Sequence, residues 1–175
     1  LLGPPSYTRD QLEAAVRPGT CATLVLSGDG GQVMVVEVLK ANGTGRLIVT
    51  GRVGELLRES AELVFSFWKN RLRDDVAFGK HDYHIHFPHA ATPKEGTGAG
   101  LPMALAFASS VSGKPIAPRT AAVGEVTLHG RVLRATGLRE KLAAAERAGV
   151  EQLLLPEANR AEALQAASKM DVAGM

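Results

Sequence analysis

Residues 84–100 read His-Ile-His-Phe-Pro-His-Ala-Ala-Thr-Pro-Lys-Glu-Gly-Thr-Gly-Ala-Gly, and the rest of the chain is organised around them. Ile85 and Phe87 alternate with His84 and His86, which is the period of a strand with one buried face. The Pro and Gly residues that follow predict a loop, and an apolar helix is expected to begin near Ala99. A loop in this position presents its tip to solvent and to ligands.

The loop carries a motif. Thr92-Pro-Lys-Glu-Gly-Thr-Gly-Ala-Gly100 resembles the active-site loop of the Lon family of ATP-dependent proteases, whose pattern is Pro-Lys-Asp-Gly-Pro-Ser-Ala-Gly with Ser as the nucleophile. Aligned without a gap, that Ser falls on Gly98. Further along, Gly137-Leu-Arg-Glu-Lys141 is similar to the family's Gly-Leu-Lys-Glu-Lys. The resemblance therefore places Lys141 as the second member of a Ser/Lys dyad.

A third motif lies between these two. Gly124-Glu-Val-Thr-Leu-His-Gly-Arg-Val-Leu133 resembles the family's Thr-Gly-Glu-Ile-Thr-Leu-Arg-Gly hairpin, with Val123 standing where the Thr should be. The resemblance gives Glu125 a supporting place at the site. The similarity extends from about residue 19 to about residue 159, nearly the whole chain.

The chemistry of the dyad explains why the missing residues matter. A Ser/Lys pair works only if the amine is neutral enough to take the hydroxyl proton. Lys141 is expected in the first turn of a helix at 138–148, whose partial positive end disfavours an ammonium. In the family a Thr hydroxyl helps to orient the amine. Gly98 and Val123 supply neither nucleophile nor hydroxyl, so we predict that peptidase activity has been lost, and the double loss favours natural degeneration over an engineered change.

The remaining pattern predicts one α+β domain of mixed strands with helices packed on the sheet. Expected strands cover 21–27, 32–39, 45–50, 126–128, 131–134 and a buried strand at 153–155, with helices at 54–72, 101–111, 138–148 and 157–169. The helix at 54–72 is amphipathic. Its predicted core stripe consists of Leu56, Leu57, Ser60, Leu63, Val64, Phe67 and Trp68.

Two segments are expected within the chain. Residues 1–18 are predicted to form a linker and a short helix that follow an absent upstream ATPase module, and residues 19–175 the Lon-like proteolytic domain. The chain begins with Leu, so we expect it to be a piece of a longer protein. The resemblance implies that ATP and Mg²⁺ belong to the upstream module only, with no cofactor in this domain. It also implies a hexameric ring and unfolded polypeptides as substrates.

Composition limits the other classes of protein. The 175 residues are 45% hydrophobic and 22% charged, enough for one domain with a core. A net charge of +2 without a basic block, and only 5% aromatic residues, disfavour nucleic-acid binding. No apolar run reaches the length of a membrane span, so no membrane partner is expected. Cys21 stands alone, which fits a reducing intracellular compartment, the cytoplasm or an organelle matrix.

Three further features have functional alternatives. His81, His84, His86 and His89 raise the question of a metal site, but beyond Asp82 no carboxylate or Cys stands at ligand spacing, so structural roles are preferred and no metal is predicted. The glycines at 96–100 suggest a phosphate-binding loop, although position 101 is Leu and no Gly-Lys-Ser/Thr follows. Thr97 carries a hydroxyl beside the nucleophile position, but we expect its side chain to leave the loop in another direction.

Three hypotheses remain open at this point. The first is a pseudoprotease, a Lon-like domain of an AAA+ machine that has lost its nucleophile and serves in assembly or substrate holding. The second is an active serine-class endopeptidase whose Ser was artificially replaced or which uses Thr97. The third is a ligand-binding module built on the Gly-rich loop.

Overall fold

The computed structural model describes residues 12, 16–27, 30–72, 75, 78–88 and 98–173. Most of the predicted linker and helix at 1–18 lies outside this range, and the division into a linker and a proteolytic domain stays a prediction. The described residues form a mixed sheet with helices packed on it, which confirms the expected α+β class.

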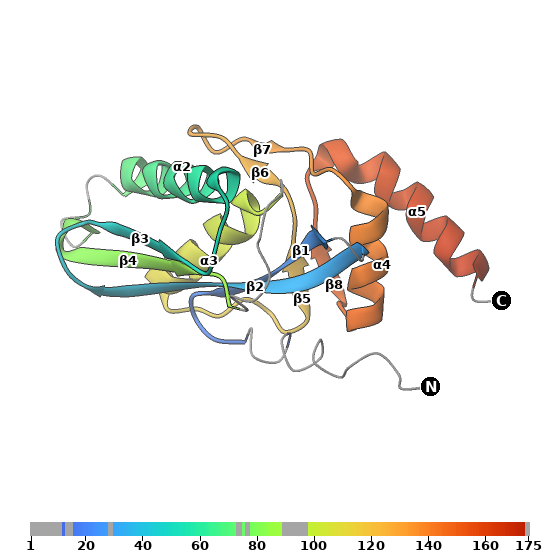
Figure 1. The fold of residues 1–175 in the computed structure, drawn as a ribbon, viewed down its shortest axis with the longest axis horizontal. Coiled ribbons are helices and arrows are strands. Elements are labelled where there is room, and N and C mark those ends of the chain that lie inside the picture. The colour runs from blue at the N-terminus through green and yellow to red at the C-terminus, as the bar shows by residue number, and fades with distance from the viewer. Residues whose placement is uncertain are drawn as a thin grey trace.

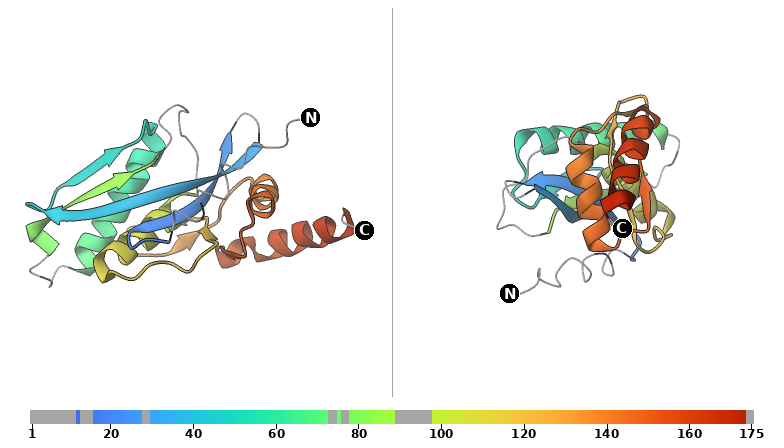
Figure 2. Two further views of the ribbon diagram at one scale, coloured as in Figure 1. Left: turned by 90° about the horizontal axis from the view of Figure 1, so that it is seen from below. Right: turned by 90° about the vertical axis from the view of Figure 1, so that its right-hand side faces the viewer.

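The main sheet has six strands in the order β3-β4-β2-β1-β5-β8. Strands β1 and β2, which contain the runs expected as strands at 21–27 and 32–39, form an antiparallel hairpin in which Ser27 pairs with Gly30. Strand β4 is antiparallel to β2, whereas the β3–β4, β1–β5 and β5–β8 pairs are parallel. The bounds are β1 Thr20–Ser27, β2 Gly30–Asn42, β3 Leu47–Thr50, β4 His81–His86, β5 Thr120–Ala122 and β8 Gln152–Leu154. The long strand β2 links the two ends of the molecule (Figure 2).

The other elements complete the fold. A separate antiparallel hairpin, predicted from the sequence, joins β6 to β7. Figure 1 shows α2 along one side of the sheet, and α4 and α5 at the end opposite the β2–β3 turn. The bounds are β6 Glu125–Val126, β7 Val132–Leu133, α2 Glu55–Arg71, α3 Gly100–Ser112, α4 Leu138–Ala148 and α5 Arg160–Ala173, with short 3-10 helices η1 Phe78–Lys80 and η2 Glu157–Asn159.

The larger core lies between one face of the sheet and helices α2 and α3. Phe107 of α3 is fully buried and stacks on Trp68 of α2 and on Tyr83 of β4, with ring centroids 5.9 and 4.7 Å away. The indole N–H of Trp68 donates to the carbonyl of Ala104 at 3.1 Å. The prediction that Trp68 belongs to the core is confirmed, and Phe67 packs edge-on against it at 5.2 Å while remaining half-buried.

The predicted stripe on α2 needs one correction. Leu56 is 60% exposed, whereas its neighbour Leu57 is buried together with Ala61 and Val64. Successive residues of a helix point about 100° apart, so only one of two adjacent leucines faces the core. The sequence pattern alone did not decide which one.

A second, smaller core lies on the opposite face of the sheet, under α4. Gly31 of β2 allows this contact, because a Cβ at that position would lie 2.2 Å from the carbonyl oxygen of Glu140. Ala144, Ala145 and Ala148 of α4 are buried against this part of the sheet. The predicted bounds of this helix, 138–148, are confirmed.

The end of the chain differs from its prediction. The strand expected to be buried at 153–155 is β8, and Leu154 is 43% exposed because β8 is the last strand at the edge of the sheet. The final helix α5 begins at Arg160, after η2 at Glu157–Asn159, rather than at residue 157.

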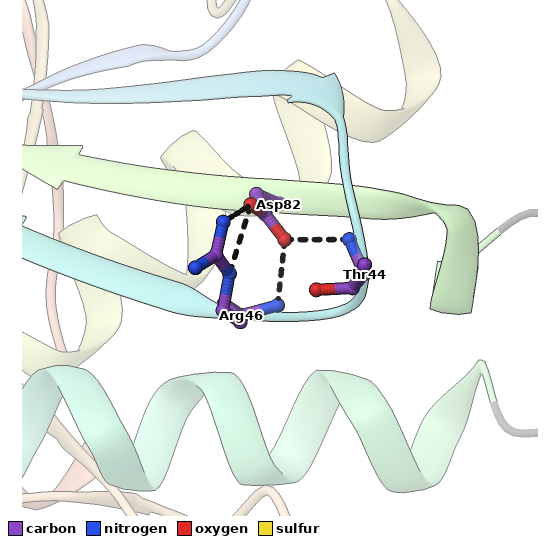
Figure 3. Close-up of polar contacts among 3 residues, drawn as sticks. All are labelled: Thr44, Arg46 and Asp82. Carbon is purple, nitrogen blue, oxygen red and sulfur yellow. Dashed lines mark hydrogen bonds and ion pairs between the residues drawn. The ribbon is translucent and has the colours of Figure 1, made fainter.

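Asp82 fixes the turn between β2 and β3 (Figure 3). Its Oδ1 accepts the backbone N–H groups of Thr44 and Arg46 at 2.8 and 3.0 Å, and its Oδ2 accepts Nε and Nη2 of Arg46 at 3.2 and 2.9 Å. These bonds, led by the backbone N–H of Arg46, lower the pKa of Asp82 from 3.8 to about 2. Asp82 therefore acts in the structure of the turn.

This geometry predicts a pH dependence of stability. Because the folded pKa of Asp82 is depressed, its contribution is present above pH 4 and is lost as the pH falls from about 4 to about 2. We expect the urea midpoint to fall between pH 5 and pH 2.5, and to fall less in Asp82→Asn. The exposed Glu146→Gln variant serves as the control and should follow the unmodified protein. An equal fall in all three would contradict this role.

Candidate functional site

Gly98 lies two residues before the start of α3 and faces the side chain of Lys141. A Cβ at Gly98 would lie 2.9 Å from Nζ of Lys141, 3.7 Å from Cβ of Ala135 and 3.8 Å from the backbone N of Gly124. Residues separated widely in the sequence thus meet at one point, where the resemblance implies a nucleophile next to an amine. The φ angle of Gly98 is +107°, a conformation that side-chain-bearing residues rarely adopt.

Lys141 is almost fully buried, with 1% of its surface exposed. It lies in the first turn of α4, as expected, and its backbone N–H donates to the carbonyl of Gly137 at 3.2 Å. Burial lowers the pKa of the Lys141 amine, and the carboxylate of Glu125 opposes this effect. A desolvated lysine in this position suits proton transfer to and from a neighbouring group, provided that such a group is present.

Val123 follows β5 and directly precedes Gly124, whose backbone N adjoins the site. It is fully buried, its N–H donates to the carbonyl of Leu154 at 3.0 Å, and its side chain belongs to the core under α4. A valine side chain has no hydrogen bond to offer to an amine. The structure therefore shows an apolar side chain where the resemblance implies a hydroxyl that orients the lysine.

Glu125 connects the site to α2. The backbone N–H of Gly98 donates to Oε1 of Glu125, and the hydroxyl of Ser60 donates to Oε2 at 3.1 Å. Sequence reasoning assigned Ser60 only to the packing stripe of α2 and missed this contact. The sequence does show a hydroxyl within an otherwise apolar stripe, which suggests that Ser60 has a polar partner. That partner, Glu125, is 65 residues away and is identified only by the fold.

A groove opens beside Glu125 between α2 and the β6–β7 hairpin. Its volume is about 530 Å³. Most of the lining is apolar, and Glu59, Glu125 and His129 are its ionisable side chains. The other lining residues are Leu56, Ser60, Leu63, Val126, Thr127, Leu128 and Leu133. Leu56, Leu128 and Leu133 are the most exposed of its apolar side chains, at 60%, 54% and 42%.

The histidines form a different arrangement. Nε2 of His84 and Nδ1 of His86 each lie 2.7 Å from the hydroxyl of Thr50, on the sheet face that the sequence assigned to them. Within the described part of the chain, no three His, Cys, Asp or Glu side chains are grouped to hold a metal ion. His89, Thr97 and most of the Gly-rich loop lie outside the described residues, so the alternatives that depend on them stay untested.

The fold and the site together define a class of protein. A buried lysine in the first turn of α4 faces a glycine two residues before α3, and these are the positions to which the resemblance assigns the amine and the replaced nucleophile of a Ser/Lys pair. The family model for the Lon protease (S16) C-terminal proteolytic domain matches residues 1–171, and the chain belongs to this family.

Curated relatives agree with this assignment. The chain is 40% identical over 163 residues to a Lon protease of Desulforamulus reducens, covering 91% of this chain and 20% of the relative. It is 40% identical over 166 residues to a Lon protease of Phenylobacterium zucineum, covering 93% of this chain and 21% of that relative. Lon protease 1 of Thermus thermophilus is 39% identical to this chain over 165 residues, covering 92% of this chain and 21% of that relative. The chain thus spans about a fifth of the length of these relatives.

Proposed function

We propose that this chain is a Lon-type proteolytic-fold domain that has lost peptidase activity and acts in substrate holding and assembly within a longer protein. One observation carries the proposal: the residue that faces the buried amine of Lys141 is Gly98, which has no side chain to act as a nucleophile. The valine at position 123 supports it, because the hydroxyl that would orient the amine is also absent. The roles of Lys141, Glu125 and the two replaced positions are part of this proposal.

The groove between α2 and the β6–β7 hairpin supports substrate holding. It adjoins the site through Glu125, and its exposed leucines would gain burial from an apolar segment of an unfolded polypeptide. Glu59 and Glu125 favour a segment that also carries basic residues. A domain that retained such a groove without a nucleophile would bind a polypeptide without cutting it.

Polypeptide holding is tested at Leu56. We expect Leu56→Glu to weaken the binding of a fluorescent, reduced and alkylated protein about tenfold, because burial of one leucine contributes about 1.5–3 kcal/mol and a charge would be placed in the apolar groove. Fluorescence anisotropy measures the dissociation constant. Leu39→Glu is the matched control, since Leu39 is 64% exposed on the open face of β2, away from the groove residues. Equal losses in both variants, or no binding by the unmodified chain, would refute polypeptide holding at the groove.

The assembly role concerns the whole protein. We infer an upstream ATPase module that binds ATP and Mg²⁺ and a hexameric ring, supported by the family and by relatives about five times longer than the matched segment. Light scattering of the whole protein with nucleotide is expected to show hexamers. A monomer at micromolar concentration would count against a ring.

Among the described residues no helix is long and apolar enough to cross a bilayer.

We also propose a reducing intracellular compartment. Cys21 is a free thiol, 1% exposed, and burial raises its pKa to about 12. Such a thiol is inert and gives the domain no stabilisation through a disulfide. Fractionation of cells that express the whole protein tests the compartment, and recovery from a secreted fraction would contradict it.

A further inference from the structure

The corner between β8 and α5 lies behind the candidate site. The carbonyl of Leu154 accepts the N–H of Val123 at 3.0 Å. Cγ of Pro156 lies 2.9 Å from the point that a Cβ on Gly124 would occupy. The corner therefore supports the strand end that leads into Glu125.

Asn159, the last residue of η2, forms the most specific contact of this corner. It is fully buried, and its side-chain amide pairs with both backbone groups of Ala135: the N–H of Ala135 donates to Oδ1 at 2.8 Å, and Nδ2 donates to the carbonyl oxygen at 2.9 Å. Nδ2 also donates to Glu162 at 3.3 Å, and Glu162 pairs with Arg134 at 2.7 Å. These partners fix the orientation of the amide.

Ala135 in turn belongs to the pocket of Lys141. It is fully buried. A Cβ added to Gly98 would lie 3.7 Å from the Cβ of Ala135 and 2.9 Å from Nζ of Lys141, so these two side chains line the same pocket. Two residues later, Gly137 supplies the carbonyl that accepts the N–H of Lys141. The backbone that Asn159 holds is therefore the segment that forms one wall of the pocket and leads into α4.

We propose that Asn159 is a positioning residue of this site, whose amide holds the Ala135 backbone so that the Ala135 methyl group closes the pocket around the Lys141 amine. Without the amide, a buried N–H and a buried carbonyl of Ala135 would lose their partners. The wall would then move to satisfy these groups and admit water to the amine. The inference goes beyond the proposed function, since it holds whether or not residue 98 carries a nucleophile.

The test compares two substitutions in the whole chain. Asn159→Leu keeps a side chain of similar size and removes both hydrogen bonds to Ala135. Glu162→Gln keeps the pair between Asn159 and Ala135 and is the matched control. Cyanate, a small reagent that carbamoylates neutral amines, is applied across a range of pH. Peptide mass spectrometry then follows Lys141, with the exposed Lys69 as an internal reference in every sample.

We expect the midpoint of the Lys141 profile, taken relative to Lys69, to move to higher pH in Asn159→Leu and to stay in place in Glu162→Gln. Burial lowers the pKa of this amine and the charge of Glu125 raises it, and neither substitution alters Glu125, so a shift to higher pH reports a loss of burial. A general loss of stability without a change in the wall would leave the midpoint where it is. An unchanged midpoint in Asn159→Leu would overturn the proposal.

A second measurement needs no substitution. Hydrogen exchange of the unmodified chain, read residue by residue by NMR, is expected to show the Ala135 amide exchanging at least ~100-fold more slowly than an unstructured peptide. This remains decisive even if Asn159→Leu does not fold. Exchange of the Ala135 amide at the rate of an unstructured peptide would show that Asn159 does not hold it.

Discussion

No cleavage of unfolded protein or of fluorogenic peptides above background is expected from the unmodified chain. Loss of the nucleophile of a serine protease removes on the order of a millionfold in turnover and leaves only binding and oxyanion effects. The buried amine of Lys141 lies beside Gly98, which offers it no hydroxyl to deprotonate. Single-turnover assays and labelling with a covalent serine-protease inhibitor should both be negative.

Restoring activity should need more than one substitution. In Gly98→Ser the new Cβ would start 2.9 Å from Nζ of Lys141, a contact that the flexible lysine side chain can relieve. The φ of +107° is harder to accommodate, because an L-residue there is strained and the loop must change its backbone conformation. Val123→Thr would return a hydroxyl next to the amine. We expect the double variant to recover more activity than the sum of the single variants, since these groups act as one unit.

Lys141→Ala in the double variant provides the control. It should abolish any activity gained, which would link that activity to the amine. Hydrolysis by the unmodified chain that Lys141→Ala removes would disprove the loss of activity, and Thr97 would then be the nucleophile to test. Labelling of the unmodified chain by the serine-protease inhibitor would argue in the same direction.

The second large effect is on stability. Phe107→Ala is expected to lower the free energy of unfolding by about 3–5 kcal/mol, because Phe107 is fully buried and stacks between Trp68 and Tyr83. Tyr83 is fixed in strand β4 and Trp68 in helix α2, so these neighbours can only partly fill the cavity. Urea unfolding followed by Trp68 fluorescence and by circular dichroism gives the change. Leu164→Ala, on a residue that is 64% exposed, should change it by less than about 0.5 kcal/mol.

A loss below about 1 kcal/mol in Phe107→Ala would show that the aromatic cluster is not the centre of the larger core. Phe107→Leu is an informative intermediate. It retains most of the buried apolar volume but not the ring contacts, so it should lose clearly less stability than the alanine variant.

Local patterns in the sequence were enough for much of the architecture. The β1–β2 hairpin follows from two Val- and Leu-rich runs around a glycine turn, and the helix at 138–148 was predicted with its observed bounds. The alternation of Ile85 and Phe87 with His84 and His86 also gave the correct buried face of β4. These features depend on backbone preference and on residue periodicity, which neighbouring residues determine together. The three motifs likewise indicated the family and the positions of the candidate site.

Other features were decided only by tertiary structure. The exposure of Leu56, the bond from Ser60 to Glu125 and the pairing of Asn159 with Ala135 depend on which elements pack against each other. The sequence by itself determined that residue 98 is glycine and that residue 141 is lysine. Only the fold brought these two residues together and buried the amine. A charged group is desolvated when residues distant in the chain pack around it and exclude water.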